Sequence, residues 1–119
     1  MKNNILIYDD DPEILLVSKI ILEQKDYKIY TRESCDNIIA DITLEQPGLI
    51  LMDLWIPKMG GEHALKLIKD NENTWQIPII LFSALDDIAE ISIRSNADGY
   101  LRKPFSIEEL IDVVEKNMV

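Results

Sequence analysis

The chain has little of what small proteins use as covalent or metal cross-links: one cysteine and one histidine in 119 residues. The single cysteine, Cys35, excludes an internal disulfide and fits a reducing compartment. The single histidine, His63, cannot be combined with other histidines or with a cysteine cluster into a zinc site. No apolar run approaches the roughly 20 residues of a membrane span, and the polar first residues do not resemble a signal peptide. We therefore expect a cytoplasmic protein that does not enter the membrane.

Basic residues are also scarce, with 12 Lys and Arg against 22 Asp and Glu and a formal net charge of −10. A phosphate backbone is held by clustered Lys and Arg, so direct nucleic-acid binding by this chain is not expected. The length is typical of one domain, and 47% hydrophobic residues are enough to build its core. The composition predicts a single domain over residues 1–119.

Short apolar runs alternate with longer amphipathic stretches along the chain. The expected strands are Ile5–Tyr8, Lys28–Tyr30, Leu49–Met52, Ile79–Phe82 and Gly99–Leu101. The expected helices are Pro12–Lys25, Cys35–Gln46, Glu62–Asp70, Asp87–Ser95 and Ile107–Met118. Three of the runs are almost entirely aliphatic, which is typical of parallel strands covered on both faces. Five successive strand–helix units predict a three-layer, doubly wound (βα)5 fold of the α/β class.

Local signals at the ends of the helices agree with this alternation. Asp11 precedes Pro12, so it can cap the first helix, where proline is tolerated at the first position. Ser106 and Glu109 have the spacing of a capping box for the last helix. Asn96 follows the fourth helix, where a left-handed residue is often needed. The short span from Ser83 to Lys103 leaves that helix only about two turns.

Polar residues follow the central strands at the points where they end. Asp9, Asp10 and Asp11 follow the first strand, Asp53 the third, Ser83 the fourth and Lys103 the fifth. The carboxyl ends of parallel strands lie along one edge of a sheet, and ligands of open α/β sheets bind there.

If the first and third strands are neighbours, the carboxylates of Asp9, Asp10 and Asp53 crowd together. Such a cluster binds a proton or a cation, and oxygen ligands with retained waters suit Mg²⁺. Lys103 and Ser83 could then hold an incoming anion. An acidic cluster with a metal, a lysine and a hydroxyl is typical of phosphoryl transfer, with a carboxylate as the nucleophile.

Four segments of the sequence resemble the receiver domain of two-component response regulators, and the resemblance extends from end to end. They are residues 5–12 (ILIYDDDP), 51–61 (LMDLWIPKMGG), 79–84 (IILFSA) and 97–105 (ADGYLRKPF). Each segment alone is a weak signal, but all four occur in order, each at the end of an expected strand. The resemblance implies a flavodoxin-like fold with strand order 2-1-3-4-5.

The resemblance also implies a role for each site residue. Asp53 would accept a phosphoryl group from a partner histidine kinase, a phosphotransfer protein or a small phosphodonor. Asp10 and Asp53 would ligate Mg²⁺ directly, and Asp9 would act mostly through water. The backbone carbonyl of Trp55 would be a further metal ligand.

Three more residues would complete the reaction and the switch. Lys103 would pair with the phosphoryl oxygens, Ser83 would hydrogen-bond the phosphate, and Tyr100 would turn inward behind it. The Lys103–Pro104 peptide bond would be cis. Without the resemblance, Tyr100 would be interpreted as an edge-strand tyrosine with a buried ring.

Partner contacts are expected on the fourth helix, fifth strand and fifth helix, as an effector or homodimer surface. Ile88 and Ile91 share one face of the fourth helix, whereas Ile93 lies off that face and is the candidate contact. Trp55 and Leu85 follow Asp53 and Ser83 by two residues and would flank the path of a hydrolytic water. Neither can orient that water, so the sequence predicts a long-lived acyl phosphate.

Alternative functions remain open at this point. An aspartate-nucleophile phosphatase of the dehalogenase type needs an acid two residues after the nucleophile, and Trp55 cannot transfer protons. A flavin or nucleotide binder needs a Gly- or Ser/Thr-rich loop, whereas Asp9–Asp11 would repel a phosphate. A degenerate receiver that acts only as an interaction module keeps its acids without using them. The favoured interpretation is a signalling module that is not an enzyme.

Overall fold

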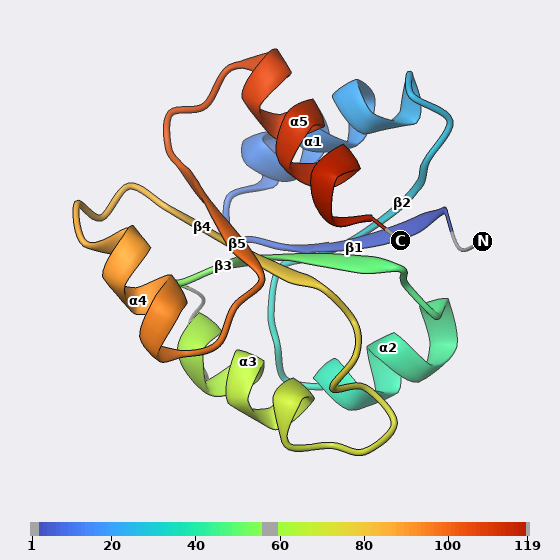
Figure 1. The fold of residues 1–119 in the computed structure, drawn as a ribbon. Coiled ribbons are helices and arrows are strands. Elements are labelled where there is room, and N and C mark those ends of the chain that lie inside the picture. Colours follow the sequence, from blue (N-terminus) through green and yellow to red (C-terminus); the bar gives the residue numbers. More distant parts are fainter. Residues whose placement is uncertain (1–2, 56–59, 119) are drawn as a thin grey trace.

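The computed structural model describes residues 3–55 and 60–118, in which five strands alternate with five helices (Figure 1). The strands are β1 (Asn4–Tyr8), β2 (Lys28–Arg32), β3 (Leu49–Asp53), β4 (Ile79–Ser83) and β5 (Gly99–Arg102). The helices are α1 (Pro12–Glu23), α2 (Ile38–Glu45), α3 (Gly61–Lys69), α4 (Ile88–Arg94) and α5 (Ile107–Asn117). Within the described ranges, no helix has the length and apolar character needed to cross a membrane.

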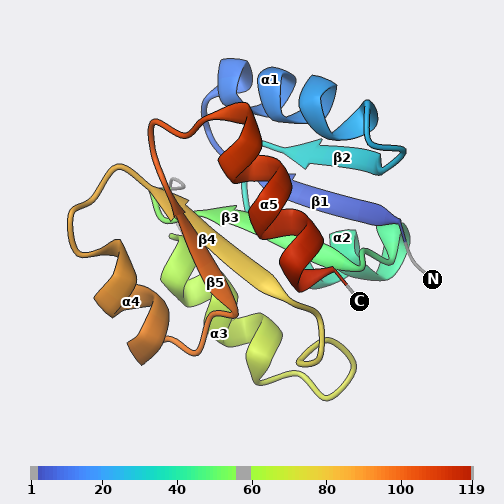
Figure 2. The same ribbon diagram turned by 45° about the horizontal axis from the view of Figure 1, so that its top comes forward.

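All five strands are parallel and lie in the order β2-β1-β3-β4-β5 (Figure 2). Helices α1 and α5 cover one face of the sheet, and α2, α3 and α4 cover the other (Figure 1). The three-layer doubly wound fold and its strand order are therefore confirmed. The strand order reverses between β1 and β3, which places a ligand-binding crevice at the carboxyl ends of these two strands.

The period-2 alternation of side chains along β1 shows why both faces of the sheet are apolar. Leu6 and Tyr8 belong to the core under α2, α3 and α4, whereas Ile5 and Ile7 belong to the core under α1 and α5. All four side chains have no exposed surface. Strands buried on both sides read as continuous apolar runs, and this made them visible in the sequence.

The predicted caps are confirmed. The Asp11 side chain accepts a hydrogen bond from the Glu13 backbone N–H at 2.9 Å, and α1 begins with Pro12. Ser106 and Glu109 form a reciprocal capping box at the start of α5. Asn96 has a φ of 60°, the left-handed conformation expected after α4. The fourth helix has seven residues, close to the predicted two turns.

The predicted start of the second helix was wrong. Cys35 does not lie in its first turn, because α2 begins three residues later, at Ile38. The Cys35 side chain is completely buried, with its Sγ 3.6 Å from Sδ of Met52, so this segment packs against β3 before the helix starts. Helix α2 ends at Glu45, one residue before the predicted limit, because Gln46 has a φ of 49° and caps the helix in the left-handed conformation. Residues 56–59 of the second resembling segment lie outside the described residues.

Candidate functional site

The carboxyl ends of four strands deliver the predicted site residues to one edge of the sheet. Asp9 directly follows β1, Asp53 ends β3, Ser83 ends β4 and Lys103 directly follows β5. The parallel pairing of β1 with β3 and of β3 with β4 brings these strand ends side by side.

Three carboxylates form a cluster at this edge. One carboxylate oxygen each of Asp9, Asp10 and Asp53 lies within 4.8 Å of the other two. Asp9 is completely buried and Asp53 is 3% exposed, whereas Asp10 is exposed. The cluster thus has two carboxylates buried inside the protein and one exposed to solvent. A hydrated cation can enter from the solvent on the side of Asp10.

Lys103 connects the two buried carboxylates. Its Nζ lies 2.8 Å from Oδ2 of Asp9 and 3.4 Å from Oδ1 of Asp53. The other oxygen of Asp9 accepts a hydrogen bond from the Asp11 backbone N–H at 2.9 Å. The ammonium also lies 4.8 Å from the centre of the Phe82 ring, a cation–π contact. Lys103 is therefore held in place from three sides.

The charges of the cluster shift the pKa values of its members. Burial and the negative charge of Asp9 raise the pKa of Asp53, although Lys103 and a backbone hydrogen bond from Trp55 act in the opposite direction. Burial lowers the pKa of Lys103, but its contacts with Asp9 and Asp53 outweigh this, so the pKa is raised overall. The ammonium therefore stays charged, and this one positive group faces a cluster of three carboxyl groups.

The residues present fit a magnesium ion. The cluster offers only carboxylate oxygens, the ligand type preferred by hard cations, and the open side at Asp10 leaves room for the waters that Mg²⁺ retains. A divalent cation would also balance the excess negative charge. The backbone carbonyl of Trp55 as a further ligand stays a prediction.

Ser83 and Tyr100 differ in their surroundings. Ser83 is buried, and its Oγ accepts a hydrogen bond from the Leu85 backbone N–H at 3.1 Å. Tyr100 lies on the edge strand β5 and is 44% exposed. Tyr100 does lie on an edge strand, as predicted, but the prediction of a buried ring was wrong, because β5 has a neighbouring strand, β4, on one side only. The switching roles of Ser83 and Tyr100 stay predictions.

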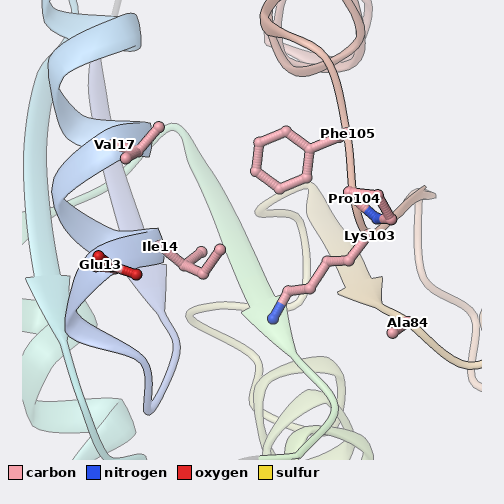
Figure 3. Close-up of a pocket in the computed structure, with 7 residues that line it drawn as sticks. All are labelled: Glu13, Ile14, Val17, Ala84, Lys103, Pro104 and Phe105. Atoms are coloured by element: carbon pink, nitrogen blue, oxygen red, sulfur yellow. The ribbon is translucent and has the colours of Figure 1, made fainter.

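A cavity of about 520 Å³ opens beside Lys103. Figure 3 shows Ile14 and Val17 of α1 on one side and Pro104 and Phe105 on the other, with the Lys103 side chain extending between them. Apart from Glu13 and Lys103 its lining is apolar. A molecule that approaches Lys103 from this side thus meets an apolar surface next to the charged cluster.

Two contributors to the site were not recognised in the sequence. The backbone at Gly61 packs so closely against the Asp53 carbonyl that a Cβ would collide with it, and only glycine fits. The consecutive glycines at positions 60 and 61 were the available signal. The second contributor is Tyr8, which directly precedes Asp9. Its hydroxyl donates a hydrogen bond to Asp41 in α2, and no local sequence pattern predicts a contact between residues so far apart.

Known proteins resemble this chain in sequence and in fold. The family model described as the response regulator receiver domain matches residues 5–115. The chain is 36% identical over 111 residues to the DNA-binding dual master transcriptional regulator RpaA of Synechocystis sp., covering 90% of this chain and 45% of that protein. It is 36% identical over 121 residues to the nisin biosynthesis regulatory protein NisR of Lactococcus lactis subsp. lactis, covering 99% and 51% respectively.

A solved structure of a putative response regulator from Chloroflexus aurantiacus has the same fold, with a TM-score of 0.91 at 24% identity over 99% of this chain and 98% of that one. The chain belongs to the response regulator receiver domain family. It is a phosphoacceptor domain of two-component signalling, a class of domain that interacts with histidine kinases. It spans about half the length of the curated relatives named above.

Proposed function

We propose that Asp53 is the phosphoryl acceptor and that Mg²⁺ is required. A carboxylate oxygen of Asp53 attacks the phosphorus atom, and the bond from phosphorus to the donor breaks. The leaving group, a kinase or phosphotransfer histidine or the carboxylate of a small acyl phosphate, keeps the electron pair. The observation that carries the proposal is the Lys103 ammonium, which lies between Asp9 and Asp53 inside the carboxylate cluster.

The residues around Asp53 have separate tasks in this proposal. Asp9, Asp10, Asp53 and the Trp55 carbonyl hold the cation, with Asp9 acting mostly through water. When bound there, the ion would neutralise charge on the phosphoryl oxygens. Lys103 leaves the carboxylates and pairs with the phosphoryl oxygens, a movement within the reach of its flexible side chain.

The same proposal extends to the output of the domain. Ser83 exchanges its contact with the Leu85 N–H for the phosphoryl group, and Tyr100 turns from solvent toward the space that Ser83 leaves. Both changes border the surface formed by α4, β5 and α5, where Ile93 is 78% exposed. We place an effector or a second copy of this chain on that surface.

We further propose that residues 1–119 form one receiver domain that turns over no substrate and acts in the cytoplasm. The family model matches most of the chain, and one sheet organises the described residues. A phosphatase of the dehalogenase type is disfavoured, because Trp55 stands where its acid–base residue is needed.

Mass spectrometry after incubation with acetyl phosphate tests the acceptor. The wild-type chain with Mg²⁺ should gain one phosphoryl group that is labile to base and hydroxylamine, and chelation should abolish the gain. Asp53→Asn should gain none, whereas Asp112→Asn, a matched change on the exposed side of α5, should react as the wild type does.

Full modification of Asp53→Asn would refute the assignment. A wild type that gains no phosphate from any donor would favour the degenerate receiver. Steady release of phosphate would favour the phosphatase.

A further inference from the structure

The buried tyrosine that ends β1 makes a hydrogen bond to α2. Tyr8 has no exposed surface, and its hydroxyl donates to Oδ2 of Asp41 at 2.8 Å. Burial and the bond to Asp41 raise the pKa of Tyr8, so the hydroxyl stays protonated and remains a donor. This bond ties the last residue of β1 to a helix 33 positions away in the sequence.

Arg32 links Asp41 back to the start of the acidic turn, residues 9–11, and so closes a circuit of hydrogen bonds and ion pairs. Its Nε lies 3.4 Å from Oδ1 of Asp41, and its terminal nitrogen lies 2.7 Å from Oε2 of Glu45. The backbone carbonyl of the same Arg32 accepts a hydrogen bond from the Asp9 N–H at 3.2 Å. The circuit runs from Tyr8 through Asp41 and Arg32 to the backbone of Asp9, which is covalently joined to Tyr8.

The circuit fixes the backbone from which the acidic cluster projects. Asp9 is held on one side by this circuit and on the other by Lys103 and the Asp11 N–H. Asp10 is exposed, and no hydrogen bond of its side chain is found within the described residues. The direction of the Asp10 carboxylate therefore depends on how firmly the Tyr8–Asp9 backbone is held.

We propose that Tyr8 is a positioning residue for the metal site, acting through Asp41 and Arg32. The inference rests on the proposed function, because it presumes that Asp9, Asp10 and Asp53 bind Mg²⁺. Without the Tyr8 hydroxyl, the turn samples orientations that do not bind the ion. The apparent dissociation constant is the intrinsic constant divided by the fraction of molecules in the competent orientation. If that fraction falls to between a third and a tenth, the constant rises about threefold to tenfold.

A Mg²⁺ titration of the purified chain, followed by tryptophan emission and by melting temperature, measures this constant. Tyr8→Phe keeps the ring and removes only the hydroxyl, so the core stays filled. We expect its Mg²⁺ dissociation constant to rise about threefold to tenfold. Tyr30→Phe is the matched control, because Tyr30 packs against the same core and its hydroxyl has no hydrogen bond among the described residues. Its Mg²⁺ constant should equal that of the wild type.

A purely structural role for Tyr8 would lower the melting temperature in chelator and leave the Mg²⁺ constant unchanged, and that result would overturn the proposal. Asp41→Ala tests the route of the effect. In the Asp41→Ala background, Tyr8→Phe should cause no further loss of affinity, and a full additional loss would also overturn the proposal. If Asp41→Ala does not fold, the Mg²⁺ dissociation constant of Tyr8→Phe alone decides the proposal.

Different results would overturn the proposed function and the positioning role of Tyr8. A wild-type chain that binds no Mg²⁺ overturns both the proposed function and the positioning role. A wild type that binds Mg²⁺ and a Tyr8→Phe variant that binds it equally well overturn the positioning role alone.

Discussion

Replacing Asp53 by asparagine should make the metal-free protein more stable. Asp53 is 3% exposed and faces two carboxylates within 4.8 Å and one ammonium at 3.4 Å. At an effective dielectric constant of about 20, each like-charge contact costs about 3.5 kcal/mol and the ion pair contributes about 5 kcal/mol. The balance is unfavourable by about 2 kcal/mol, and solvent around the exposed Asp10 reduces it further to about 1 kcal/mol.

The amide keeps the shape of the side chain and removes this repulsion. A gain of about 1–2 kcal/mol corresponds to a rise in melting temperature of about 4–8 °C for a domain of this size. The pKa of Asp53 is raised in the folded state, so the wild type loses stability as the pH rises through that value. The difference between variant and wild type should therefore grow with rising pH and vanish in acid, where the carboxyl is protonated in both the folded and unfolded chains.

In the presence of Mg²⁺, the wild type should be more stable than Asp53→Asn. At a Mg²⁺ concentration about 100 times the dissociation constant, binding adds about 2.7 kcal/mol to the stability of the wild type, and most of this is lost without the Asp53 carboxylate. Thermal melts of both proteins in chelator and in excess Mg²⁺, over a series of pH values, measure the effect. The exposed Asp112→Asn is the control and should melt as the wild type does. A chelated Asp53→Asn protein that melts below the wild type would refute the repulsion argument.

Three further predictions concern acyl-phosphate lifetime, association through α4 and the reactivity of the cysteine. Trp55, which is 67% exposed, and the half-buried Leu85 line one cavity of about 460 Å³. The double variant Trp55→Asn, Leu85→Glu should speed decay of the phosphorylated protein by up to about 10²-fold, and unchanged decay would contradict shielding. Ile93→Lys should leave phosphorylation intact and weaken association measured by sedimentation, whereas unaltered association would remove it from the interface. Burial and nearby carboxylates raise the pKa of Cys35 to about 12. The folded protein should therefore resist iodoacetamide at about pH 8 and react only in denaturant, and rapid alkylation of the native state would contradict this.

Local chemistry accounts for what the sequence determined by itself. A cap such as Asp11 or Ser106 involves residues two or three positions apart, so its pattern is readable without the fold. The apolar strands and the amphipathic helices between them then imply a parallel sheet, because parallel strands need crossover helices. A parallel sheet in turn collects the strand ends at one edge, and the acids, serine and lysine of the site were recognised from that inference.

Long-range packing decided the rest. The contact between Lys103 and Asp9 joins residues 94 positions apart, and only the strand order brings them within 2.8 Å. Cys35 precedes α2 because its side chain packs against Met52, a contact that helix propensity does not encode. Tyr100 is exposed because β5 lies at the edge of the sheet, and the same residue in a central strand would be covered. The circuit from Tyr8 to Asp9 combines two strands and a helix, so its partners could be identified only when the chain was folded.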